Sequence, residues 1–166
     1  ATLLLKDINL LQFRLIAMLA GLAAFNRLDL VLFFLPALCY ILFILRSRQA
    51  VAALLVGFAP VICWEGFSIV YYGFPFPNTY YAKLCAGIPP MDLATQGLRY
   101  LVDCLMRDPM TIIAVAASFT AAAITRNKRF LLISGGTLLY LLYIIHNGGC
   151  FMAGRFLTAP MLCSVA

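Results

Sequence analysis

One group of residues able to contact a ligand follows a long apolar run and lies within residues 71–84. It contains Asn78, Tyr80, Tyr81 and Lys83, preceded by two prolines and several aromatic rings. The prolines favour an extended chain, the amide and phenols can hydrogen-bond to a sugar, and Lys83 offers a charge for a phosphate. The simpler alternative is an aromatic belt at a membrane surface, with a proline turn and a lysine that reaches water.

A second group lies in residues 146–156, where His146 is followed by Gly148-Gly149 and Arg155. Paired glycines let a ligand approach the backbone closely, and an arginine can bind a phosphate with two hydrogen bonds. The alternative is a glycine turn between two helices with one interfacial arginine. His146 is the only histidine, and metal binding would need carboxylates from elsewhere, so a capping or interface role is favoured and no metal site is expected.

A third group consists of charges within or beside apolar runs. Glu65 lies inside one, where an ionised carboxylate costs about 2.5 kcal/mol or more, so we expect it to face the helix bundle with a partner or a proton. A structural contact between helices, with Tyr71, Tyr72 or Arg99 as partner, is the alternative. Arg14 is expected to be structural, and Arg27 and Asp29 to pair across a tight hairpin.

Composition indicates the elements that must position these residues. Hydrophobic residues make up 64% of the 166 and charged residues only 11%, with a mean hydropathy of +1.00, which excludes a soluble fold. The net charge of +6 is spread over short clusters, so a nucleic-acid partner is not expected. The apolar runs are 15 to 23 residues long without two-residue alternation, which predicts an all-α, polytopic transmembrane bundle.

The sequence predicts one transmembrane domain over residues 1–166, with about five complete spans and the start of a sixth. The expected spans are 8–25, 28–45, 50–72, 110–124 and 130–145, followed by a partial span at 156–166. The basic connectors 46–48 and 126–129 are expected in the cytoplasm, so the loop 73–109 and the segment 146–155 face outward. The spans from 110 and 130 are short for a bilayer.

Within the outward loop, residues 97–106 predict an interfacial helix with Leu98, Leu101, Val102 and Leu105 on its apolar face. Arg99 and Asp103 lie four residues apart on another face. Pro109 is expected to open the next span. A stripe of small residues, Ala114, Ser118 and Ala122, predicts close approach of a neighbouring helix.

The chain ends and the cysteines add two expectations. The chain begins with Ala1 instead of Met and its last apolar run stops before it could span, which suggests a piece of a longer protein. The six cysteines include no CxxC pair, so redox and metal motifs are not expected. A disulfide between Cys85 and Cys104 is one alternative and six unpaired thiols is the other.

Several motifs together resemble a known family. They are Tyr72-Gly73-Phe74-Pro75-Phe76-Pro77-Asn78-Thr79, Ala82-Lys83-Leu84, Gly97-Leu98-Arg99-Tyr100-Leu101, Asp108-Pro109, and Gly148-Gly149-x-Phe151-Met152-x-Gly154-Arg155-Phe156. An Arg-x-Asp hairpin at residues 23–29 adds to them. The chain resembles the multi-spanning bacterial glycosyltransferases of the GT-C superfamily, and most closely its branch of terminal β-(1→2)-arabinofuranosyltransferases and related envelope enzymes.

The resemblance implies transfer of a sugar, such as arabinofuranose, from a polyprenyl-phosphate donor to an extracytoplasmic envelope glycan, with inversion. It implies a bacterial inner membrane, with the motif loops facing the periplasm or cell exterior. Lys83 and Arg155 would meet the donor phosphate, while Asn78, Tyr80 and Tyr81 would border the sugar or acceptor; His146 and Glu65 complete the candidate substrate site. If an enzyme of this kind uses a divalent metal, the full-length protein would bind it.

Two departures from the family pattern bear on activity. Cys150 stands where the family has an acidic residue, which removes a charge able to hold a metal or orient a hydroxyl. The family's catalytic aspartate lies in a first external loop that has no match here, so the base is expected upstream of Ala1 and the segment alone is expected to be inactive.

Two other functions stay open. A proton-coupled lipid or solute transporter would use Glu65 for protons and the Gly148-Gly149 break at its substrate site. A non-catalytic membrane subunit or decayed homologue is favoured by Cys150.

Overall fold

The computed structural model describes residues 9–75, 81, 87–150 and 154–165, and these residues form helices and short connections without a strand. The predicted all-α fold class is therefore confirmed for this part of the chain. The chain divides into two compact units, Ala1–Asn78 and Thr79–Ala166.

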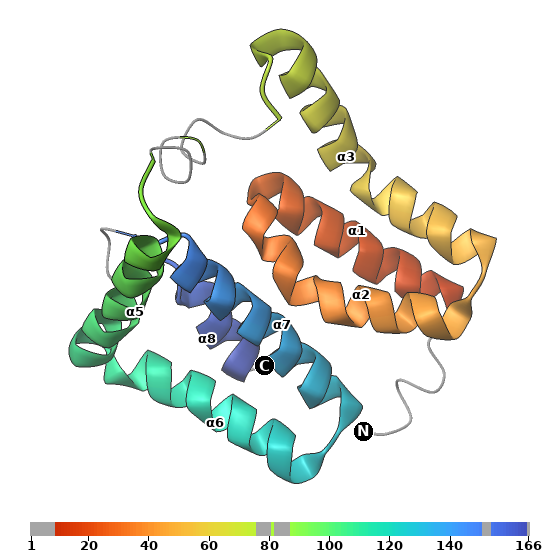
Figure 1. The fold of residues 1–166 in the computed structure, drawn as a ribbon. Helices are drawn as coiled ribbons and strands as arrows, with labels where there is room; N and C mark the ends of the chain where they lie inside the picture. Colours follow the sequence, from red (N-terminus) through yellow and green to blue (C-terminus); the bar gives the residue numbers. More distant parts are fainter. Residues whose placement is uncertain (1–8, 76–80, 82–86, 151–153, 166) are drawn as a thin grey trace. The chain divides into compact units, whose positions relative to one another are not determined.

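The first unit contains three long helices and one short 3-10 helix (Figure 1). They are α1 (Leu10–Asn26), η2 (Leu28–Leu30), α2 (Val31–Leu45) and α3 (Arg48–Tyr72). The side chain of Asn9 caps α1 by accepting from the Gln12 backbone N–H, and Ser47 caps α3 by accepting from Ala50. These caps, together with the turns at η2 and residue 46, reverse the chain twice, so α1 and α3 run in the same direction.

α1 and α3 pack backbone to backbone. The facing residues are small: Ala17, Ala20, Gly21 and Ala24 on α1, and Ala50, Ala53 and Gly57 on α3. A methyl group added at Gly57 would lie 2.7 Å from the Ala17 carbonyl carbon, and one at Gly21 would overlap the Gly57 carbonyl. Such small-residue contacts are how helices associate in lipid, where the hydrophobic effect does not drive them together.

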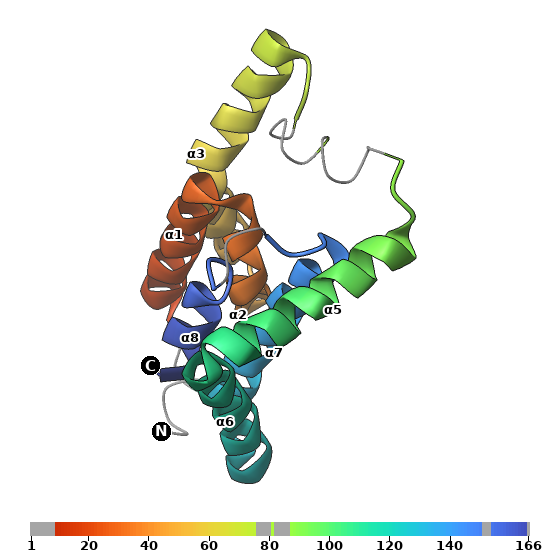
Figure 2. The same ribbon diagram turned by 90° about the vertical axis from the view of Figure 1, so that its left-hand side faces the viewer.

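The second unit begins with an amphipathic helix that lies across the end of a helical hairpin (Figures 1 and 2). It contains α5 (Pro90–Arg107), α6 (Pro109–Thr125), α7 (Lys128–His146) and α8 (Thr158–Val165). α6 and α7 form the hairpin, α8 packs against both, and α5 is bent 110° away from α6. Pro109 begins α6, as the sequence predicted, and Asp108 caps it by accepting from the Thr111 N–H.

Among the described residues, three helical segments are long and apolar enough to cross a membrane: Leu28–Leu45, Arg48–Tyr72 and Lys128–His146. The bent pair α5 and α6 would make a fourth if counted as one broken span. The expected spans from residues 8 and 110 do form helices, but α1 and α6 each have 17 residues, about 26 Å at 1.5 Å per residue. These apolar helices suggest a membrane protein.

The outer faces of the helices carry large apolar side chains. On α3, for example, Val56 is 74% exposed and Val70 is 88% exposed, while the buried residues are Ala50, Ala53, Gly57 and Val61. Phe13, Leu38 and Ile41 are buried as well, so the distinguishing feature is the large number of exposed apolar side chains, which fits helices surrounded by lipid.

Candidate functional site

The second unit builds a site where α7 ends. Asn147 follows the last residue of α7, and Gly148 and Gly149 then adopt left-handed backbone conformations, with φ of 73° and 71°. The Gly148 N–H donates to Ile145 O at 3.2 Å and the Gly149 N–H to Ile144 O at 3.0 Å. These bonds satisfy the last carbonyls of α7 and turn the chain sharply, a conformation that favours glycine at both positions. We call residues 147–150 the glycine turn.

The glycine turn packs directly against α5. A methyl group at Gly149 would lie 2.6 Å from the Cβ and Cγ atoms of Tyr100, so this residue has no room for a side chain. On the α5 side, a methyl group at Gly97 would lie 2.6 Å from the Cα of Ile145 in α7. Glycines on both partners therefore allow α5 to lie against the end of α7.

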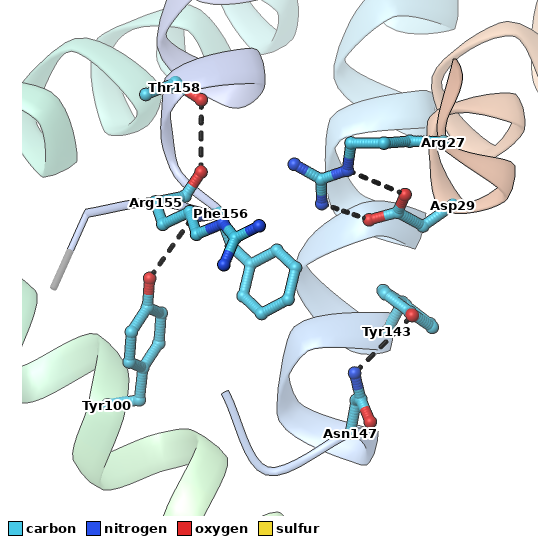
Figure 3. Close-up of polar contacts among 8 residues, drawn as sticks. All are labelled: Arg27, Asp29, Tyr100, Tyr143, Asn147, Arg155, Phe156 and Thr158. Carbon is cyan, nitrogen blue, oxygen red and sulfur yellow. Dashed lines mark hydrogen bonds and ion pairs between the residues drawn. The ribbon is translucent and has the colours of Figure 1, made fainter. Parts of the chain in front are cut away.

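Tyr100 fastens the segment that follows the turn. Its hydroxyl oxygen accepts from the Phe156 backbone N–H at 3.3 Å, and its ring meets that of Phe156 edge to face with centroids 6.4 Å apart (Figure 3). One helical turn further along α5, the Cys104 sulfur accepts from the Gly154 N–H at 3.4 Å. Burial raises the pKa of Tyr100 to about 12, which keeps the phenol neutral near pH 7.

Three cationic or titratable side chains are exposed around this packed core. Arg155 directly precedes Phe156, Arg99 directly precedes Tyr100, and His146 is the last residue of α7. The Arg155 carbonyl accepts from the Thr158 hydroxyl at 3.1 Å, which holds this backbone at the start of α8 (Figure 3). The sequence predicted a role for Arg155 and His146. It did not predict that Tyr100 and Cys104 would hold the backbone that carries Arg155.

α5 has three distinct faces. Its buried face packs against the protein and consists of Leu93, Gly97, Tyr100 and Cys104. The apolar face predicted for an interfacial helix is largely exposed, with Leu98 at 53% and Val102 at 55%. Asp103 pairs with Arg107 at 2.9 Å instead of with Arg99, and this contact raises the pKa of Arg107. An exposed apolar face beside a charged one fits a helix at a membrane surface.

The first unit holds the remaining described candidates. Arg27 and Asp29 form the expected pair, with Arg27 Nε 3.1 Å from Asp29 Oδ1 and a second bond from Nη2 to Oδ2 (Figure 3). Glu65 is half-exposed on α3 and has no hydrogen bond or ion pair within residues 9–75. The partner expected for Glu65 is therefore not observed there. Arg14 is exposed on α1.

An aromatic cluster that was not predicted from the sequence lies on both sides of Glu65 along α3. Trp64, Phe67 and Tyr71 form consecutive ring contacts, with centroids 5.8 Å apart for the first pair and 5.3 Å for the second. Phe25 of α1 meets Trp64 edge to face, and Tyr72 meets both Phe67 and Tyr71. The spacing of three and four residues was the available signal, since it places these rings on one helix face.

Part of the proline-rich group lies outside the described residues. The residues outside are Asn78, Tyr80, Lys83 and Cys85, so the roles predicted for them, including the disulfide from Cys85 to Cys104, stay untested. Tyr81 is described, and its side chain is half-buried. Among the described residues, no group of three metal-ligating side chains comes together.

No known family, curated protein or solved structure matches the chain.

Proposed function

We propose that the chain is part of a membrane glycosyltransferase that moves a sugar, such as arabinofuranose, from a polyprenyl-phosphate donor to an extracytoplasmic envelope glycan. One observation carries the proposal. Two motifs some fifty residues apart, Gly97–Leu101 and Gly148–Phe156, meet in the contacts of Tyr100 with Gly149 and Phe156. Arg155 is exposed beside these contacts and suits a phosphate.

The arrangement of the second unit supports a site at headgroup depth. α7 is long enough to span, and it has the basic turn Arg126–Arg129 at one end and the glycine turn at the other. With that basic turn in the cytoplasm, the glycine turn faces outward. If α6 follows the membrane normal, the 110° bend leaves α5 within about 20° of the membrane plane, since 110° exceeds 90° by 20°.

In this proposal, Arg155 binds the donor phosphate and offsets its charge as the bond to the sugar breaks and polyprenyl phosphate leaves. Charge stabilisation of this kind acts most strongly where water is excluded. Lys83 adds a second cation, and Asn78, Tyr80 and Tyr81 border the sugar or acceptor. The base that activates the acceptor hydroxyl is assigned to no residue of this chain, and Cys150 stands where the resemblance implies an acid.

We further propose a five-span topology in a bacterial inner membrane. It needs α1 and α6 to cross despite having 17 residues each, which requires flanking residues or local thinning of the bilayer. Cysteine labelling in intact cells tests the sidedness directly. Probes at positions 83 and 155 on opposite sides of the membrane would exclude a shared donor site.

The decisive experiment measures sugar transfer from a polyprenyl-phosphate donor by the full-length protein in detergent. Arg155→Ala is expected to lower the rate about 10²-fold or more, as loss of a single charge-stabilising group does elsewhere, and Arg155→Lys to retain part of it. Arg126→Ala is the matched control, because Arg126 is an exposed arginine at the other end of the α6–α7 hairpin. Full transfer by Arg155→Ala would overturn the role of Arg155. No transfer, even after Cys150→Asp, would favour a non-catalytic homologue.

The second candidate function is a proton-coupled transporter. It is favoured by Glu65, which lies half-exposed in a 25-residue candidate span without a partner in the described part of that unit. Uptake into proteoliposomes that depends on a proton gradient and is abolished by Glu65→Gln would support it over the transferase.

A further inference from the structure

Two cysteines are held at one place in the second unit. Cys104 is 1% exposed and lies one helical turn after Tyr100 on the buried face of α5. Cys150 is half-buried and directly follows Gly149 in the glycine turn. The two thiols are distant in sequence and belong to the two elements that pack against each other.

Two contacts place Cys150 near Cys104. Gly149, directly before Cys150, packs against the Cβ of Tyr100, and the Gly154 N–H donates to the Cys104 sulfur at 3.4 Å. Tyr100 and Cys104 lie four residues apart, about 6 Å along the axis of α5. Both thiols are free in this structure, and a disulfide between them requires Cα atoms roughly 4.4 to 6.8 Å apart.

The electrostatics of Tyr100 agree with this placement. After burial, which is the largest cause, a hydrogen bond with Cys104 and the charges of the Cys104 and Cys150 thiolates also raise the pKa of the Tyr100 phenol. These causes fit the placement of both cysteines beside Tyr100 that the backbone contacts indicate.

We propose that Cys104 and Cys150 are a redox pair that closes to a disulfide and staples the glycine turn to α5. The inference goes beyond the glycosyltransferase proposal: the pairing depends on the packing of α5 against the turn, and the persistence of the disulfide rests on the outward placement proposed above. The outward face to which the loop charges assign both residues is an oxidising compartment in bacteria, where disulfides persist.

The oxidant is a disulfide, either of a thiol oxidase or of oxidised glutathione. The more accessible Cys150 thiolate attacks one sulfur of this disulfide, which releases one thiol and leaves a mixed disulfide on Cys150. The Cys104 thiolate then attacks the Cys150 sulfur and releases the second thiol. Two electrons pass from the cysteines to the oxidant, whose two sulfurs leave as thiols with the two protons.

The other described cysteines provide internal controls. Cys39 and Cys63 are exposed on α2 and α3 of the first unit, and Cys163 lies in α8. Cys85 is the competing partner for Cys104 that the sequence suggested. The proposal therefore predicts one specific linkage out of several that six cysteines allow.

The test oxidises the full chain in native membranes with oxidised glutathione and maps linkages by non-reducing digestion and mass spectrometry. The Cys104–Cys150 peptide pair is expected in most molecules, and it should disappear in Cys150→Ala but persist in Cys163→Ala. The oxidised wild type should also unfold at a higher temperature than the reduced protein, a shift absent from Cys150→Ala. A Cys85–Cys104 linkage, or two free thiols in folded protein after oxidation, would overturn the proposal. Since Cys104 is buried and its substitution risks unfolding, the test depends on Cys150→Ala and the wild type.

Discussion

Gly149 offers the sharpest test of how the glycine turn meets α5. Gly149→Ala adds one methyl group at a residue whose φ is 71° and whose new Cβ would lie 2.6 Å from the Cβ of Tyr100. The left-handed conformation costs a non-glycine residue about 1 to 2 kcal/mol. Overpacking against a neighbour adds about 1 to 3 kcal/mol, so the free energy of unfolding should fall by about 2 to 5 kcal/mol in total.

Gly154→Ala is the matched control, because it separates the two contributions. Gly154 has a φ of 76°, but an added Cβ there would meet no atom within 4 Å. Its substitution should cost only the conformational part, about 1 to 2 kcal/mol.

Both variants are compared by reversible unfolding in detergent, followed by far-UV circular dichroism. Tryptophan fluorescence is less informative, since the only tryptophan, Trp64, lies in the first unit. If Gly149→Ala proves no less stable than Gly154→Ala, then α5 does not pack on the glycine turn as described. The shared placement of Tyr100 and Arg155 would then lose its basis.

Three further predictions test other parts of the chain. Gly57→Ala should destabilise the first unit by about 1 to 3 kcal/mol, because its Cβ would lie 2.7 Å from the Ala17 carbonyl carbon. Gly66→Ala, which has open space around it, should be neutral or stabilising by up to about 1 kcal/mol. Thermal unfolding of the two variants in detergent distinguishes these outcomes. Burial raises the pKa of Tyr100 to about 12, compared with its ordinary value of 10.0. The free energy of unfolding should therefore be constant with respect to this group below pH 10 and decrease between pH 10 and 12. Tyr100→Phe should remove that pH dependence, and it also loses the hydrogen bond to Phe156, worth about 1 kcal/mol. Hydrogen bonds from Thr111 lower the pKa of Asp108, so its cap on α6 should hold at neutral pH and be lost as the pH falls through that lowered pKa. The Thr111 amide should then lose protection, measured as its exchange rate relative to the unfolded chain at the same pH, and Asp108→Asn should not show this pH response.

The features predicted correctly from the sequence depend on neighbours in the chain. Pro109 at the start of α6 and the pair of Arg27 with Asp29 follow from local backbone preferences and a two-residue separation. A glycine turn after residue 146 was one of the two interpretations offered, and the structure shows it.

The features that were missed depend on contacts distant in sequence. In an apolar helix both the lipid-facing and the protein-facing sides are hydrophobic, so periodicity cannot identify the packing side. On the amphipathic helix α5, Leu98 and Val102 were predicted to lie at the membrane surface and are exposed, but no local pattern indicated that Tyr100 and Cys104 would pack against the rest of the unit. Asp103 had two arginines four residues away, and the pattern alone could not choose between Arg99 and Arg107.

The hydrogen bonds from Phe156 to Tyr100 and from Gly154 to Cys104 have a mechanical consequence. Because they tie the backbone on both sides of Arg155 to α5, that backbone follows when the helix tilts. A helix lying on a leaflet rises and sinks with the thickness of that leaflet. The height of the Arg155 guanidinium above the hydrocarbon would therefore be set by the lipid composition, and shorter-chain lipids would bring it to a different depth than longer-chain ones.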